Sequence, residues 1–169
     1  MHSRKLKVAL VNMNSTANKI ENLQKVEKFI IEAYERSTQW LILPEMFSYL
    51  GPQDNLWSQA ETEKEALFKK LSNLAKKFKL CLFAGSVPER PFSEEKKDKT
   101  QKVYNTSYVF SEKGALLAKY RKINLFKAKS KTLNIDESKN FLNGNTPCVF
   151  SHMGWKVGVS ICFDLRFPN

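Results

Sequence analysis

The run WLILPE, residues 40–45, is the second of three short apolar stretches that set the architecture predicted for this chain. Its unbroken apolar residues are typical of a buried strand, and Pro44 ends the strand because proline has no amide hydrogen to offer a sheet. The run LKVALVNM, residues 6–13, precedes it, and LCLFAGSV, residues 80–87, follows it. All three are predicted to be buried strands.

Two amphipathic helices are predicted between these strands, over residues 18–36 and 62–78. In both segments apolar side chains recur at helical spacing and would cover one face of the sheet. The predicted capping residues are Asn18 with Glu21, and Thr62 with Glu65. The alternation of strand and helix favours an α/β layered fold.

The middle of the chain predicts a loop followed by a hairpin. Residues 89–101 are polar and charged, which is typical of an exposed loop. KVYNTSYVF, residues 102–110, and ALLAKYR, residues 115–121, predict two strands joined by SEKG, in which Gly114 supplies the turn.

The last third predicts a long irregular segment and a second hairpin. Residues 122–147 contain few branched apolar side chains, so we expect a loop that is functional or disordered. CVFSHMGWKVGVSIC, residues 148–162, predicts a hairpin that turns near residues 153–154 and presents Cys162 at its end. With no internal repeat in view, residues 1–169 are predicted to form a single domain without a second one.

Composition and charge exclude several classes of function. A hydrophobic fraction of 42% favours a folded core, and no apolar run reaches the roughly 18 residues of a membrane helix, so no membrane partner is expected. The net charge is +11, but only five of the 28 basic residues are arginine, and the lysines are mixed with acidic residues. This predicts a solvated surface and no nucleic-acid partner.

The cysteines and histidines argue against disulfides and metal sites. Cys81, Cys148 and Cys162 are an odd set without Cys-x-x-Cys spacing, which favours a reducing, cytoplasmic location. His2 and His152 are not at zinc-ligand spacing from a cysteine, so no metal is expected. No glycine-rich phosphate loop is present in the sequence, and no cofactor is predicted.

Three ionisable residues each end a predicted strand: Glu45, Lys122 and Cys162. Ligands gather at the carboxyl ends of strands in open α/β sheets. Taken singly, each residue has an ordinary interpretation, as a turn glutamate, a surface lysine or a small buried hydrophobe. Neither histidine is placed to form a Ser-His-Asp or Cys-His pair.

Four short words occur in order along the chain: LPEMF, YRKINLF, DES and ICFDLRFP. Together with AGSVPER and YNTSYVF, they closely resemble the nitrilase superfamily of carbon–nitrogen hydrolases over essentially the whole chain. The resemblance is strongest to nitrilase-like amidases of small, carboxylate-bearing amides, such as omega-amidases and deaminated-glutathione amidases. It implies hydrolysis of a non-peptide C–N bond in a small-molecule amide, through a cysteine thioester and with release of ammonia.

The resemblance also implies a role for each site residue. Cys162 would be the nucleophile and Glu45 the general base that takes its proton. Lys122 would stabilise the oxyanion, with the backbone N–H of Phe163 as a second donor. Glu137, in DES, would hold Lys122 or the substrate in place.

The sequence departs from the superfamily pattern in two residues. Phe163 stands where a tyrosine is usual, and Lys127 stands where an acidic residue is common. The first removes a hydroxyl near the nucleophile, and the second is expected to alter the loop or the choice of substrate.

The resemblance implies a four-layer α-β-β-α sandwich, of which this chain would be the incomplete, N-terminal portion. Members of the superfamily continue beyond the cysteine with a helix, whose start would favour a thiolate at Cys162, and with further strands. The chain alone is therefore expected to expose apolar surface, whereas the complete fold would assemble into homo-oligomers. The alternative to an amidase is a truncated, inactive remnant, or an interaction module that needs a second chain to complete the fold.

Overall fold

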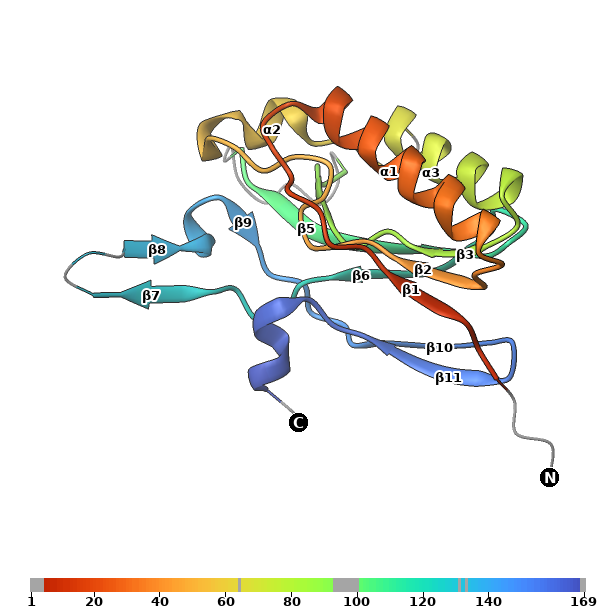
Figure 1. Ribbon diagram of the computed structural model, residues 1–169. Coiled ribbons are helices and arrows are strands. Elements are labelled where there is room, and N and C mark those ends of the chain that lie inside the picture. Colours follow the sequence, from red (N-terminus) through yellow and green to blue (C-terminus); the bar gives the residue numbers. More distant parts are fainter. Residues whose placement is uncertain (1–4, 64, 93–100, 131, 133, 168–169) are drawn as a thin grey trace.

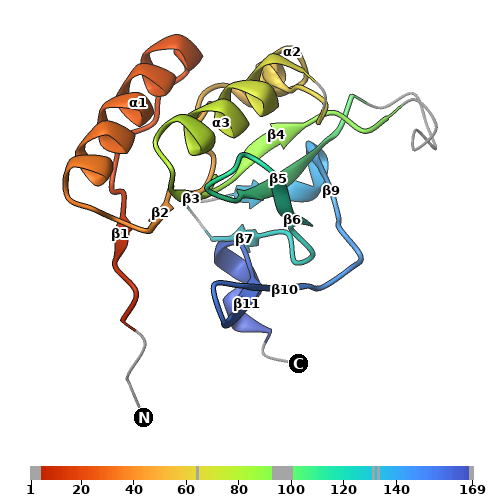
Figure 2. The same ribbon diagram turned by 90° about the vertical axis from the view of Figure 1, so that its right-hand side faces the viewer.

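The computed structural model describes residues 5–63, 65–92, 101–130, 132 and 134–167. Helices α1 (Lys19–Glu35) and α3 (Ala66–Lys77) lie on one side of a central sheet. An outer ribbon of β10 (Cys148–His152) and β11 (Trp155–Val159) lies on the other side (Figure 1). Figure 2 shows the same layers after a quarter turn, with the two helices above the strands. This layering confirms the predicted α/β class.

The central sheet is mixed, and among the described residues it contains seven strands. They are β1 (Val8–Leu10), β2 (Trp40–Ile42), β3 (Cys81–Phe83), β4 (Val87–Glu89), β5 (Val103–Phe110), β6 (Leu116–Arg121) and β9 (Phe141–Leu142). β1, β2 and β3 are parallel, β5 is antiparallel to β3, and β6 is antiparallel to β5. The carboxyl ends of β2 and β6 therefore lie at the same edge of the sheet.

The side chains of residues 40–43 alternate between the two faces of the central sheet and therefore contribute to two separate hydrophobic cores. Leu41 and Leu43 face the helices, where they join the cluster that includes Ile30 of α1. Trp40 packs with Phe83 on the opposite face, toward the outer ribbon. Burial of one such large apolar side chain stabilises the fold by about 1.5–3 kcal/mol.

The predicted start of the first helix is confirmed, because the side chain of Asn18 accepts the backbone N–H of Glu21 at 3.1 Å. The second helix begins four residues later than predicted. The Glu65 carboxylate does accept the Thr62 N–H at 2.7 Å, yet Glu65 itself is the N-cap of α3. The carboxylate of Glu61 accepts the first-turn N–H of Leu67 at 2.7 Å, which supplies the missing cap. Two short turns precede α3: η1 (Gln53–Asn55) and α2 (Leu56–Gln59).

The predicted exposed loop at residues 89–101 is wrong at its start. Glu89 is the last residue of β4 and is fully buried. Its carboxylate accepts hydrogen bonds from Arg121 at 2.8 and 3.0 Å and from Thr106. These charged and polar partners, contributed by β5 and β6, allow an acidic residue to be buried. Residues 93–100 of the predicted loop lie outside the described residues.

The predicted irregular segment at residues 122–147 contains regular structure. A projecting ribbon of β7 (Lys127–Lys129) and β8 (Asn134–Asp136) is followed by the single turn η3 (Glu137–Lys139) and then by β9. Each of these strands is only three residues long, which is too short for an alternating pattern to indicate a strand in the sequence. An ion pair of 3.0 Å between Lys127 and Asp136 joins its two strands.

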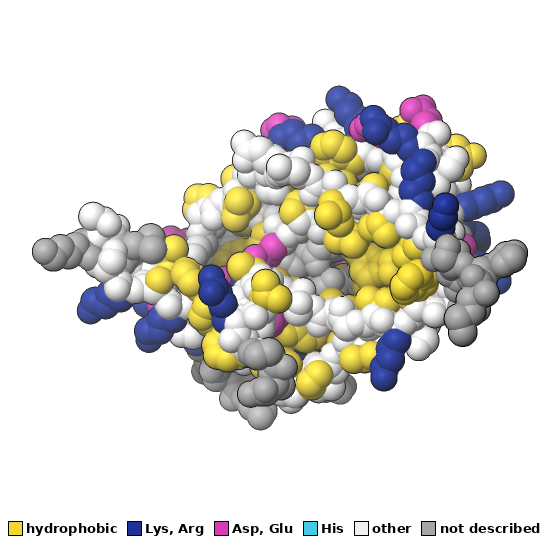
Figure 3. All heavy atoms as spheres, turned by 60° about the horizontal axis from the view of Figure 1, so that its bottom comes forward, with side chains coloured by type: hydrophobic (Ala, Val, Ile, Leu, Met, Phe, Trp, Pro, Cys, Tyr) yellow, Lys and Arg dark blue, Asp and Glu magenta, His cyan; other side chains and the backbone are white. Residues whose placement is uncertain are grey.

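Both predicted hairpins are confirmed. Gly114, with φ +79°, makes the turn between β5 and β6, and Met153 with Gly154 makes the turn of the outer ribbon. On the outer ribbon, Val149 and Trp155 are exposed. The lower face of the molecule accordingly shows a hollow lined by apolar side chains (Figure 3). In the described part of the chain, no helix has the length and apolar character needed to cross a membrane.

Gly85 is required by the close approach of two backbone segments. Its φ is +37°, and a Cβ at this position would lie 1.9 Å from the Pro44 carbonyl oxygen. We expect Gly85→Ala to destabilise the fold by about 3 kcal/mol, because the clash is with backbone atoms of residues 43 and 44 rather than with the end of a flexible side chain. Urea denaturation followed by circular dichroism measures this difference.

Gly158→Ala is the matched control, since a Cβ added to Gly158 meets no atom within 4 Å. We expect it to change the free energy of unfolding by less than about 0.5 kcal/mol. Equal destabilisation by the two alanines would contradict the close approach at Gly85.

Candidate active site

Glu45 lies in a turn that follows β2 at the carboxyl edge of the sheet. Ser86 holds this turn by three hydrogen bonds. Its Oγ accepts the N–H of Met46 at 2.9 Å, its own N–H donates to the Pro44 carbonyl at 3.2 Å, and its carbonyl accepts the N–H of Phe47 at 3.2 Å. Met46 has φ +51°, so the chain reverses sharply here. The Glu45 side chain is 30% exposed and is held between the ends of neighbouring strands.

Lys122 follows β6 directly, and its side chain is only 1% exposed. Its Nζ lies 3.0 Å from Glu45 Oε1 and 3.0 Å from Glu137 Oε2. Burial, the largest single influence, acts to lower the pKa of Lys122, but hydrogen bonds to the two carboxylates outweigh it, and the pKa is raised. Lys122 is therefore a cation at neutral pH.

Glu137 is the first residue of the turn η3, and its carboxylate pairs with Lys122 Nζ. Its Oε2 also accepts the backbone N–H of Phe126 at 2.7 Å, and its own N–H donates to the Phe126 carbonyl at 3.0 Å. The structure thus brings a residue from the middle of a predicted loop to within 3.1 Å of a strand-end lysine.

Cys162 is the first residue of a short 3-10 helix, η4 (Cys162–Arg166), and has φ +48°. The thiol pKa is not lowered. Burial, the charge of Glu45 and a hydrogen bond to Glu45 all raise the pKa of Cys162, and the charge of Lys122 opposes them. The thiol is therefore mostly protonated at neutral pH and needs a base to react.

All three cysteines are free thiols, but they differ in their surroundings. Cys81 is buried in β3, where burial raises its pKa to about 12. Cys148 is half-buried in the outer ribbon, where burial also raises its pKa. Cys162 is exposed and alone among them lines a cavity together with Glu45.

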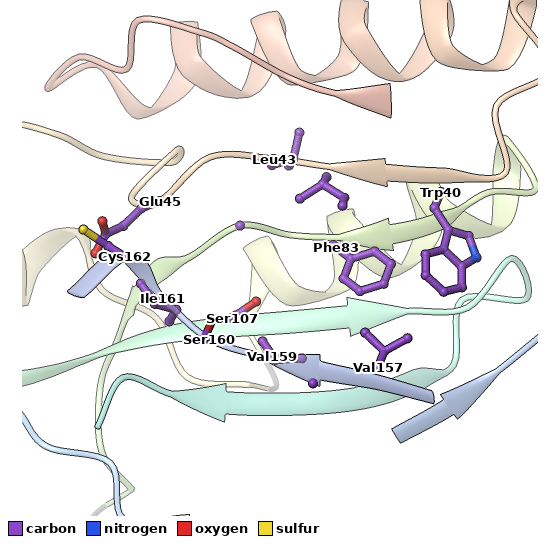
Figure 4. A pocket seen from close by; sticks show the side chains of 13 residues that line it. Trp40, Leu43, Glu45, Phe83, Ser107, Val157, Val159, Ser160, Ile161 and Cys162 are labelled. Atoms are coloured by element: carbon purple, nitrogen blue, oxygen red, sulfur yellow. The ribbon is translucent and has the colours of Figure 1, made fainter. Parts of the chain in front are cut away.

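The cavity lies between the central sheet and the outer ribbon and has a volume of about 320 Å³. At one end, the Glu45 carboxylate and the Cys162 sulfur point toward one another (Figure 4). Trp40, Phe83 and Val157 line the opposite, apolar end. A small molecule bound at the polar end would touch both the thiol and the carboxylate.

Sequence reasoning missed Asp164, which fixes η4 against the end of β6. Its carboxylate accepts the Tyr120 hydroxyl at 2.6 Å, the Asn124 N–H at 2.8 Å and the Ile161 N–H at 3.0 Å. Burial acts to raise its pKa, but these donors prevail and the pKa is lowered, so Asp164 is ionised. The only signal in the sequence was its place two residues after Cys162 in ICFDLRFP.

The two departures from the superfamily pattern lie in different settings. The ring of Phe163 packs edge-on against Phe126 at 5.1 Å and against Phe167 at 5.3 Å, so an apolar ring suits this position. Lys127 is 74% exposed on the projecting ribbon and pairs with Asp136.

Replacing Glu45 by glutamine should lower the pKa of Cys162, because both the charge and the carboxylate hydrogen bond that raise it are removed. A lower pKa means that a larger fraction of Cys162 is thiolate at neutral pH, so we expect faster alkylation by iodoacetamide at that pH. Peptide mass spectrometry across a pH series reads the rate at Cys162 separately from Cys81 and Cys148.

Glu137→Gln is the control, since the charge of Glu137 also raises the pKa of Cys162 but ranks lowest among the influences on it. We expect a smaller change in the same direction. An unchanged alkylation rate in Glu45→Gln would show that Glu45 does not face the thiol in solution.

The chain is similar to known proteins both in sequence and in structure. A family model described as carbon-nitrogen hydrolase matches residues 7–169. The chain is 37% identical over 175 residues to the omega-amidase NIT3 of Saccharomyces cerevisiae, covering 99% of this chain and 58% of that protein. It is 30% identical over 170 residues to the deaminated glutathione amidase of Dictyostelium discoideum, covering 96% of this chain and 57% of that protein.

Among solved structures, the chain is similar to the crystal structure of Saccharomyces cerevisiae Nit3, described as a member of branch 10 of the nitrilase superfamily. The TM-score is 0.80 at 36% identity, with 96% of this chain and 57% of that chain covered. The chain spans about half the length of the curated relatives it matches, from 58% of the omega-amidase NIT3 of Saccharomyces cerevisiae to 44% of the chloroplastic omega-amidase of Arabidopsis thaliana.

Proposed function

The chain belongs to the carbon–nitrogen hydrolase family, and from that premise we propose that it carries the active site of an amidase. The reaction is hydrolysis of a small primary amide to a carboxylic acid and ammonia. One observation carries the proposal: Lys122 Nζ lies 3.0 Å from Glu45 Oε1, and the Cys162 thiol faces the same carboxylate at one end of a cavity.

In the first half of the reaction, Glu45 takes the thiol proton while the Cys162 sulfur attacks the amide carbonyl carbon. The carbonyl oxygen becomes an oxyanion, which Lys122 and the N–H of Phe163 stabilise. The raised pKa of Cys162 supports the role of Glu45 as the base, because a thiol that is mostly protonated needs a base before it can attack.

The oxyanion then collapses, the C–N bond breaks, and the proton held by Glu45 passes to the departing ammonia. A thioester between the acyl group and Cys162 remains. In the second half, Glu45 takes a proton from water, the hydroxide oxygen attacks the thioester, and the proton returns to the sulfur as the acid leaves. The net reaction converts an amide and water into a carboxylic acid and ammonia.

Glu137 holds Lys122 in this scheme. Its contacts with the Phe126 backbone restrict its movement, and the ion pair holds Nζ beside the Glu45 carboxylate. Two carboxylates around one buried lysine keep that lysine charged throughout the reaction.

Carboxylate-bearing amides are the substrates we propose. The support is the similarity to proteins named omega-amidase and deaminated glutathione amidase. The basic surface, with a net charge of +11, would attract such anionic substrates. We further propose a single domain that works in a reducing compartment such as the cytoplasm, where a free thiol persists.

A second candidate is an interaction module that binds another polypeptide. The observation that favours it is the exposure of Val149 and Trp155 on the outer ribbon. A chain with this function would associate with its partner and release no ammonia.

Ammonia release from a panel of amides, with and without a carboxylate, tests the proposal. Intact-mass spectrometry of a rapidly quenched reaction should show the chain heavier by one acyl group, and digestion should place that group on Cys162. A chain that releases ammonia without any Cys162 adduct would exclude the thioester route. A chain with neither activity nor adduct would favour the interaction module.

A further inference from the structure

Asn105 occupies a central position in β5 and is only 1% exposed. It links two of the proposed site residues. Its Nδ2 donates to Glu45 Oε1 at 2.8 Å, and its backbone carbonyl accepts the N–H of Lys122 at 2.9 Å. One strand residue therefore contacts both the proposed base and the backbone of the proposed oxyanion donor.

The two oxygens of the Glu45 carboxylate differ in their hydrogen-bond partners. Oε1 accepts Asn105 Nδ2 at 2.8 Å and Lys122 Nζ at 3.0 Å, and two donors saturate a carboxylate oxygen. The lone pairs of Oε2 are those left to accept the proton of the Cys162 thiol. Without the amide donor, Lys122 alone would orient the carboxylate.

The carbonyl oxygen of the Asn105 side chain is also consistent with a role in holding Glu45. Its Oδ1 is buried and has no hydrogen-bond partner among the residues that the structure describes. A buried acceptor without a partner costs about 1–3 kcal/mol, and an apolar residue of similar size would avoid that cost.

We propose that Asn105 is a positioning residue that holds Oε1 of Glu45, so that Oε2 faces the Cys162 thiol as the proton acceptor. This inference rests on the proposed function, because it assigns Glu45 the role of base. The charged groups that face the thiol are Glu45, Lys122 and Glu137. The Asn105 amide dipole partly offsets the negative charge of Glu45 in that set.

The test compares Asn105→Leu with the parent in two measurements. In ammonia release, kcat should fall by about 10- to 100-fold with KM unchanged, because the base is misplaced while the cavity is intact. In alkylation of Cys162 by iodoacetamide, the rate profile should move to lower pH, because a misplaced Glu45 carboxylate no longer raises the thiol pKa through its charge and its hydrogen bond. The melting temperature should stay within a few degrees of the parent.

The melting temperature and a neighbouring substitution separate positioning from a structural role. General loosening would also move the profile to lower pH, because burial raises the pKa of Cys162, but it would lower the melting temperature and would follow from either substitution in β5. Thr106→Val is the matched control: Thr106 is the next residue of β5, equally buried, and its hydroxyl donates to Glu89 and not to Glu45. It should lose some stability and keep both the parent kcat and the parent profile.

The inference and the proposed function can fail separately. Parent kcat and parent alkylation profile in Asn105→Leu, or equal effects of the two substitutions, would overturn the role of Asn105. If no amide is hydrolysed by the parent but Asn105→Leu alone moves the alkylation profile to lower pH without loss of melting temperature, Asn105 positions Glu45 and the amidase proposal is wrong.

Discussion

Cys162→Ala is expected to reduce ammonia release by at least about a thousandfold, because no other residue can form the thioester. Cys81 is buried in β3, and Cys148 lies in the outer ribbon, away from Glu45. Removing the sulfur leaves Glu45 and Lys122 in place, so the variant should still bind substrate. The measurement is steady-state ammonia release, with substrate binding followed separately by calorimetry.

Cys148→Ala is the control for this prediction. It removes a half-buried thiol that the proposed mechanism does not use, and turnover should remain within about twofold of the parent. Retention of parent turnover in Cys162→Ala would remove Cys162 from the mechanism. Loss of turnover in both variants, with loss of folded signal, would indicate damage to the outer ribbon rather than to the chemistry.

Lys122→Met is expected to cost both stability and activity. It leaves the carboxylates of Glu45 and Glu137 beside one another without their shared cation, which should destabilise the fold by about 3 kcal/mol. Ammonia release should fall by about a hundred- to a thousandfold, as for loss of one oxyanion donor. Urea denaturation at pH 7 measures the first effect and steady-state kinetics the second.

The pH dependence of this stabilisation has a defined direction. The pKa of Lys122 is raised in the folded state, so the stabilisation is fully present below the ordinary lysine pKa of about 10.5 and is lost as the pH rises through the raised value. The difference in unfolding free energy between parent and Lys122→Met should therefore be constant near neutral pH and shrink only in strong alkali.

Lys127→Met is the matched control, because Lys127 forms an ion pair of the same 3.0 Å length but is 74% exposed. Solvent screens such a pair, and its loss should cost less than about 1 kcal/mol. Equal destabilisation by the two substitutions would show that Lys122 is not buried between its carboxylates.

The order of elements could be predicted because it depends on local patterns. The apolar runs at residues 6–13, 40–45 and 80–87 and the helical periodicity between them each fix a backbone type within a few residues. The same patterns predicted the strand ends to within a few residues: Lys122 follows β6 directly, whereas Glu45 and Cys162 each lie three residues beyond the end of β2 and β11. Local patterns failed where partners come from elsewhere, as for the helix start supplied by Glu61 and for buried Glu89.

By itself the sequence determined which residues stand at strand ends and in which α/β order, since propensity and periodicity are properties of neighbouring residues. Only the tertiary structure decided which of them meet. Asn105 reaches Glu45 across 60 positions of the chain, and Asp164 reaches Tyr120 across 44. Those contacts set the direction of one carboxylate oxygen and the place of one thiol. They depend on how strands pair across the sheet, because hydrogen bonds act over about 3 Å in space whatever the separation in sequence.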